Sequence, residues 1–171
     1  MLALFETLFD IIRLKKGPDA IPYSWALCLI AMTLWLASGL VATILTDGMT
    51  DQHFLVGTFT GVVALACYAG ILVTDGRIPR LLQTMTAILG CGAVINFLLI
   101  AADVFLSAFL GARISGLAAL LLLLWSIVVK GHIISRAIDR KLLAGIVAAT
   151  AVFALQLYLY LLLKPAAAVT A

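Results

Sequence analysis

The stretch ISGLAALLLLLWSIVV, residues 114–129, has sixteen consecutive residues without a charge and an unbroken run of leucine at its centre. A helix of roughly 20 apolar residues matches the hydrocarbon thickness of a lipid bilayer. The apolar pattern continues past Lys130 and His132 as far as Ile134. We therefore expect residues 114–134 to form a transmembrane helix.

Four further blocks of the same kind should also span the membrane: residues 22–45, 54–73, 81–110 and 142–163. Apolar residues make up 65% of the 171 residues and charged residues only 11%, whereas soluble domains contain about 25% charged residues. The sequence therefore predicts an all-α, polytopic membrane protein, with one transmembrane domain over residues 1–171 built as a five-helix bundle. Because residues 81–110 exceed the length of a straight span, this helix should tilt, or break near Asp103.

Residues 1–17 are predicted to form an amphipathic helix that lies along the membrane surface. Apolar side chains recur there at helical spacing, at Leu2, Phe5, Leu8, Phe9 and Ile12. The segment is too short and too charged to cross a bilayer, and its basic residues would face anionic headgroups. The Gly17–Pro18 pair should end the helix, because proline cannot continue the backbone hydrogen-bond pattern.

Basic residues divide unevenly between the two sides of the membrane that five spans define. If the N-terminus is inside, nine of them are cytoplasmic: Arg13, Lys15, Lys16, Arg77, Arg80, Lys130, Arg136, Arg140 and Lys141. Only Arg113 and Lys164 are then outside. Because cytoplasmic loops carry an excess of lysine and arginine, we expect a cytoplasmic N-terminus and an external C-terminus. The nine residues form a candidate cytoplasmic basic surface.

Asn96 and Asp103 are polar residues within the third span, and their spacing of seven puts them on one helix face. An ionisable group within a span is costly to bury, which makes it a candidate for function. Arg113 follows closely enough to pair with Asp103, so the three residues form a candidate intramembrane polar site. In the alternative, structural interpretation, Asp103 lies near the outer interface and Asn96 links two helices through a hydrogen bond.

The second span contains the small-residue pattern Gly57-Thr-Phe-Thr-Gly61. Two glycines four residues apart let another helix approach closely. Gly57 and Gly61 are therefore candidate helix-packing residues, either within the bundle or between two copies of the chain.

No cofactor and no metal is expected. His53 and His132 are the only histidines, and they should lie at opposite faces of a hydrocarbon layer roughly 30 Å thick, which argues against a haem held by both. Asp47, Asp51 and His53 share one outer turn, where carboxylates and an imidazole would suit a divalent metal. Their spacing, however, matches no established metal site.

The sequence contains no G-x-S-x-G, no H-E-x-x-H and no phosphate-binding glycine loop. An enzyme that acts on lipids or isoprenoids would need a polar constellation at one interface, and the candidate set is Asp75, Arg77, Arg80, Asp139 and Arg140. Charges at helix ends are more simply explained as determinants of topology. The basic residues lack interleaved aromatics, so nucleic-acid binding is not expected.

The segment RLKKGPDAIPYS, residues 13–24, places a basic helix end and a Gly–Pro turn directly before the first span. Together with five closely spaced spans and short outer turns, this layout resembles small bacterial membrane proteins of the Yip1 superfamily over the whole chain. Eukaryotic members carry a longer N-terminal region with an Asp-Leu-Tyr-Gly-Pro motif, of which only the Gly–Pro pair has a counterpart here. The association of those members with membrane trafficking and small GTPases is therefore not expected of this chain. The resemblance implies a bacterial inner-membrane protein of unassigned activity.

These observations favour a non-enzymatic integral membrane protein that scaffolds or assists a membrane complex. Its partners would be the lipid bilayer and either another membrane protein or further copies of the chain. The alternative is a small transporter or channel-like protein that uses Asp103 and Asn96. Transporters place several polar groups near the membrane midplane, and the sequence offers few.

Overall fold

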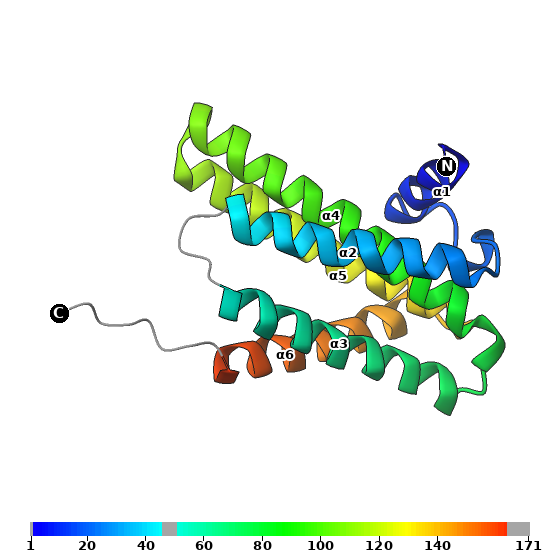
Figure 1. The fold of residues 1–171 in the computed structure, drawn as a ribbon. Helices are drawn as coiled ribbons and strands as arrows, with labels where there is room; N and C mark the ends of the chain where they lie inside the picture. The colour runs from blue at the N-terminus through cyan, green and yellow to red at the C-terminus, as the bar shows by residue number, and fades with distance from the viewer. Residues whose placement is uncertain (1, 46–50, 164–171) are drawn as a thin grey trace.

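A computed structural model describes residues 2–45 and 51–163 (Figure 1). The α-helices in these ranges are α1 (Leu2–Ile12), α2 (Trp25–Leu45), α3 (Asp51–Thr74), α4 (Leu81–Leu110), α5 (Ala112–Ala137) and α6 (Leu142–Leu163). Two 3-10 helices, η1 (Pro18–Ala20) and η2 (Ile78–Arg80), precede α2 and α4. Five helices, α2 to α6, are long and apolar enough to cross a membrane, and the described ranges contain no strand. The all-α class and the five predicted spans are confirmed.

The helix bounds lie close to the predicted ones. α6 has the predicted bounds, and α5 exceeds the predicted residues 114–134 by a few residues at each end. The long span, α4, is one continuous helix of 30 residues that passes through Asp103 without a break. α3 ends at Thr74, where Gly76 adopts the left-handed conformation (φ 72°) and the amide of Arg77 donates to the carbonyl of Leu72 at 2.8 Å. A glycine in this conformation is a common helix stop.

α1 is docked on the bundle. Its apolar side chains Leu8, Ile11 and Ile12 are buried, and the helix contacts α4 and α5. Leu8 packs on Gly90 of α4 so closely that a Cβ at Gly90 would lie 2.9 Å from a leucine methyl carbon. α1 ends at Ile12, before the Gly17–Pro18 pair expected to stop it, because the chain turns left-handed at Leu14 (φ 61°). The apolar face of α1 therefore packs against other helices of the same chain, which the sequence did not predict.

Helices adjacent in the sequence are not always neighbours in the bundle. Short connections favour the packing of consecutive helices, and α4–α5 and α5–α6 pack in this way. α2, however, packs along α4, and α3 lies mainly against α6 (Figure 1). We call the end that holds the turns from α3 to α4 and from α5 to α6 the basic end, since Arg77, Arg80, Arg136 and Arg140 lie there. The opposite end is called the open end.

Buried residues concentrate in the half of the bundle next to the basic end. Leu72 near the end of α3 and Ile133 and Ile134 near the end of α5 are completely buried. α5 and α6 approach most closely at Gly131 and Gly145, where a Cβ on Gly131 would lie 2.7 Å from the Cα of Ile146. Small residues at such a crossing let two backbones meet. Toward the open end the α4–α5 pair separates from the α3–α6 pair (Figure 1).

Candidate functional site

A cavity of about 460 Å³ lies among the five long helices α2 to α6. Each helix borders it with residues at helical spacing, so one face of each helix points at the same space. On α5 this face consists of Leu123, Ser126 and Lys130, and on α6 of Phe153, Gln156, Leu157 and Tyr160. The volume falls in the range of about 300–1,000 Å³ that is usual for small-molecule sites.

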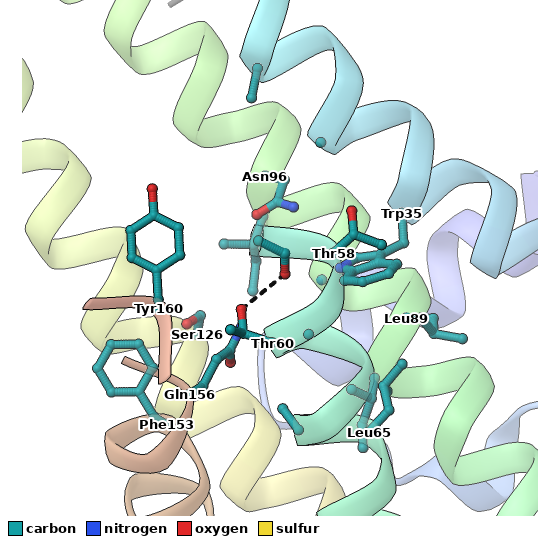
Figure 2. Close-up of a pocket in the computed structure, with 18 of the residues that line it drawn as sticks. Trp35, Thr58, Thr60, Leu65, Leu89, Asn96, Ser126, Phe153, Gln156 and Tyr160 are labelled. Carbon is teal, nitrogen blue, oxygen red and sulfur yellow. Dashed lines mark hydrogen bonds between the residues drawn. The ribbon is translucent and has the colours of Figure 1, made fainter. Parts of the chain in front are cut away.

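Uncharged polar side chains from four helices meet in this cavity: Thr60 of α3, Asn96 of α4, Ser126 of α5 and Gln156 of α6 (Figure 2). Each lies in the middle part of its helix, well inside both ends. If the helices cross a bilayer, these groups therefore lie in its interior. Polar groups at that depth need partners, because the hydrocarbon offers none.

The hydrogen bonds within the lining leave several acceptor lone pairs unused, on side chains that range from half-buried Asn96 to Thr60, which is 1% exposed. The hydroxyls of Thr60 and Ser126 donate to carbonyls of their own helices, at 3.1 and 2.7 Å. Their oxygen lone pairs are still able to accept. Asn96 Nδ2 donates to Ser38 Oγ of α2 at 3.2 Å, so its carbonyl oxygen can accept a further bond. The lining thus offers acceptor lone pairs at Thr60, Asn96 and Ser126, the whole amide of Gln156, and N–H and O–H donors on Trp35, Tyr160 and Lys130.

Lys130 of α5 is half-buried and borders the cavity one helical turn from Ser126. Within residues 2–45 and 51–163, no hydrogen bond or ion pair engages its ammonium group. The part of the cavity wall that the structure describes contains no aspartate or glutamate. The described part of the lining therefore does not balance the charge of this lysine.

Aromatic rings form much of the remaining wall. The ring of Trp35 on α2 covers Gly61 of α3, where a Cβ would lie only 2.6 Å from the ring. Phe153 and Tyr160 of α6 stand on the other side of the space (Figure 2). Small-molecule sites are generally lined in this way, with apolar walls and a few polar groups that orient the ligand.

The cavity extends toward the open end. Its limit toward the basic end is marked by Lys130 and by Tyr68, whose side chain is buried. In the other direction it reaches Thr43, His53 and Tyr160, which lie within a few residues of the ends of α2, α3 and α6. The cavity therefore extends from the middle of the bundle to the open end.

A network of ion pairs links the turns at the basic end. Asp139, in the turn after α5, binds Arg77 at 2.9 Å and Arg80 at 3.0 Å, and Asp75 binds Arg140 at 3.0 Å. The hydrogen bond from Arg80 holds the pKa of Asp139 below its ordinary value, so this carboxylate stays ionised throughout the neutral range. The five charged residues considered for lipid chemistry thus do come together. They pair with one another across the turns that join the helices.

The candidate intramembrane polar site is divided in the structure. Asn96 borders the cavity, but Asp103 and Arg113 do not. Asp103 is exposed near the open end and accepts a hydrogen bond from Ser115 Oγ at 2.8 Å. Among the residues placed by the structure, Asp103 and Arg113 form no ion pair. The helix-packing candidates also differ, since Gly61 packs against Trp35 whereas Gly57 borders the cavity with open space beside it.

The candidate basic surface is likewise divided. Arg77, Arg80 and Arg140 belong to the ion-pair network, and Lys16 pairs with Asp10 at 2.8 Å. Arg13, Lys15, Arg136 and Lys141 are exposed at the basic end. Lys130 lies apart from all of them, in the cavity wall.

The metal candidates can be followed only in part. Asp47 and the side chain of Asp51 lie outside the described residues, as does Lys164. His53 borders the mouth of the cavity, and His132 lies near the basic end, where its Nε2 is 2.9 Å from the carbonyl oxygen of Lys16. The described side chains include no group of three or more potential metal ligands.

The sequence did not predict that Thr60, Ser126, Lys130 and Gln156 border one cavity. Two features of the sequence pointed to three of them, and none pointed to Thr60. Ser126 and Lys130 are four residues apart on one helix face, and Gln156 is the single amide side chain within the apolar residues 142–163.

Comparison of the chain with protein-family models, with curated proteins and with solved structures gave no match. The geometry of the cavity therefore carries the functional argument.

Proposed function

We propose that this protein is a non-enzymatic, carrier-like integral membrane protein that binds a small polar solute inside its five-helix bundle. The observation that carries the proposal is the cavity bordered by Thr60, Asn96, Ser126 and Gln156. Solute sites of secondary transporters lie near the membrane midplane, between helices. The cavity has this position along the helices, and its volume of about 460 Å³ suits a small molecule.

We further propose that the basic end faces the cytoplasm of a bacterial inner membrane and that the open end faces outward. The excess of arginine and lysine at the basic end supports this orientation. In this orientation the buried half of the bundle and the ion pairs of Asp75 and Asp139 close the cavity toward the cytoplasm. An outward-open, inward-closed bundle is one of the two states that alternating access requires.

The polar residues of the cavity wall favour solute binding over a scaffolding role. The sequence argued against a transporter because few polar groups were evident near the midplane. Thr60, Ser126 and Gln156 supply such groups beside Asn96. Asp103, by contrast, has no part in the proposed site.

Thermal unfolding in the presence of polar solutes tests this proposal. The purified protein in mild detergent is mixed in turn with millimolar benzoate, lactate, glycine, glycerol, glucose and uracil. A solute that binds only the folded state raises the unfolding temperature by mass action. We expect at least one solute to do so and to exchange across proteoliposome membranes that contain the protein. A flat response to every solute, with no exchange, would count against solute binding.

A further inference from the structure

We infer that the solute of this cavity is a small organic anion, held by the ammonium group of Lys130. This inference rests on the proposed solute-binding function and adds the charge of the solute. Ionisable groups within a membrane protein are costly unless they are paired. Lys130 has no counter-charge in the described lining, so a bound anion would supply the missing partner.

Asp75, Asp103 and Asp139 do not border the cavity and have other partners. Asp139 is held by two arginines and Asp75 by Arg140, all at 2.9–3.0 Å. Asp103 accepts from Ser115 near the open end. The cavity wall is therefore cationic at its inner limit and otherwise neutral or aromatic in the part that the structure describes.

Lys130 lies at the end of the cavity farthest from the open end, where it would bind the charged group of a solute that enters from that side. Such a solute first meets Gln156 and Asn96 and reaches Lys130 at the inner limit of the cavity. Trp35 and Phe153 offer apolar surface to the rest of the molecule. The chemistry that fits is a single acidic group on a compact apolar or aromatic body. Benzoate is a simple probe of this class, and benzamide is its neutral counterpart of nearly the same shape.

Charge-selective thiol labelling measures the field that Lys130 produces. Cys28, Cys67 and Cys91 are replaced by alanine, and Ser126→Cys is introduced one turn from Lys130. The thiol is reacted with an anionic and with a cationic methanethiosulfonate, and each rate is divided by the rate with a free thiol in solution. Because both reagents attack the same thiolate, the ratio of the two normalised rates reports local charge alone.

We expect the normalised ratio to favour the anionic reagent by about tenfold or more, because an unscreened charge within a few ångströms acts strongly in a low-dielectric site. Lys130→Gln should bring the ratio close to one, whereas Lys130→Arg should preserve it. Benzoate should slow the labelling of the Ser126→Cys thiol at concentrations where benzamide has little effect. The assay is run in nanodiscs of phosphatidylcholine alone and with phosphatidylglycerol. Slower labelling with phosphatidylglycerol would identify a lipid headgroup as the anion.

The outcomes separate this inference from the function on which it rests. A ratio near one while Lys130 is present, or equal protection by benzoate and benzamide, would overturn the anion inference and leave solute binding intact. This result needs no lysine variant, so it does not depend on how such a variant folds. If neither reagent reached the thiol until the protein was denatured, the cavity would be dry and the proposed function itself would fail.

Discussion

The Gly145→Ala variant is expected to lose about 3 kcal/mol of unfolding free energy or more, which is the upper end of the usual cost of over-packing. A Cβ at this position would collide with the carbonyl oxygen of Gly131 and lie 2.8 Å from the backbone nitrogen of Ser135. These are backbone atoms, so no rotamer change relieves the contact. α5 and α6 would have to separate at their closest crossing. Unfolding of the purified protein by heat or by dodecyl sulfate measures the loss.

Gly70→Ala is the matched control for this prediction. Gly70 lies within α3, on an exposed face, and a Cβ there would have nothing within 4 Å. A surface substitution of this kind usually changes stability by less than about 0.5 kcal/mol. Equal stability of the two variants would contradict the close approach of α5 and α6.

Gly57→Phe is expected to weaken solute binding by at least about tenfold while the protein remains folded. Gly57 borders the cavity, and a Cβ there would have open space around it. The phenyl ring would therefore occupy volume that the solute needs. Solute-dependent thermal stabilisation and exchange in proteoliposomes measure the effect, and one tenfold step corresponds to about 1.4 kcal/mol.

The control for this variant is Gly70→Phe, which makes the same substitution in the same helix but away from the cavity. It should bind solute like the unmodified protein. Equal binding by the two variants would show that the cavity is not the site. A change of oligomeric state in Gly57→Phe alone would instead point to helix pairing through the Gly57–Gly61 motif.

The spans could be predicted from the sequence because the length of an apolar block is set directly by the bilayer. Block length also placed both ends of α6 correctly. Which helices become neighbours could not be predicted in the same way. Both lipid tails and neighbouring helices contact apolar side chains. Hydropathy therefore does not distinguish the lipid-facing side of a helix from its protein-facing side. The packing of α2 on α4 and the docking of Leu8 on Gly90 depend on shape, and a single sequence reveals that only weakly.

The cavity shows the same limit at the level of single residues. The spacing of seven predicted that Asn96 and Asp103 share a face of α4, but it could not show that only Asn96 borders the cavity. Thr60 and Ser126 could not be told from ordinary helical residues, because each hydroxyl donates a hydrogen bond to a carbonyl of its own helix. Lys130 was assigned to the basic surface because the span was expected to end near residue 134. The helix continues to Ala137, which leaves this lysine seven residues inside it.

Labelling of Gln156→Cys by a membrane-impermeant maleimide, in a cysteine-free background, tests most directly whether the bundle holds a water-filled cavity open to the outside. Its control is Leu121→Cys. Gln156 and Leu121 each lie ten residues from the contact between Gly131 and Ile146, and therefore at similar depth. Leu121, however, is 67% exposed on the outer surface of α5. In right-side-out vesicles we expect rapid labelling at Gln156→Cys and almost none at Leu121→Cys, and in inverted vesicles almost none at either. If Gln156→Cys stayed as unreactive as Leu121→Cys until the protein was denatured, the solute-binding cavity would be contradicted.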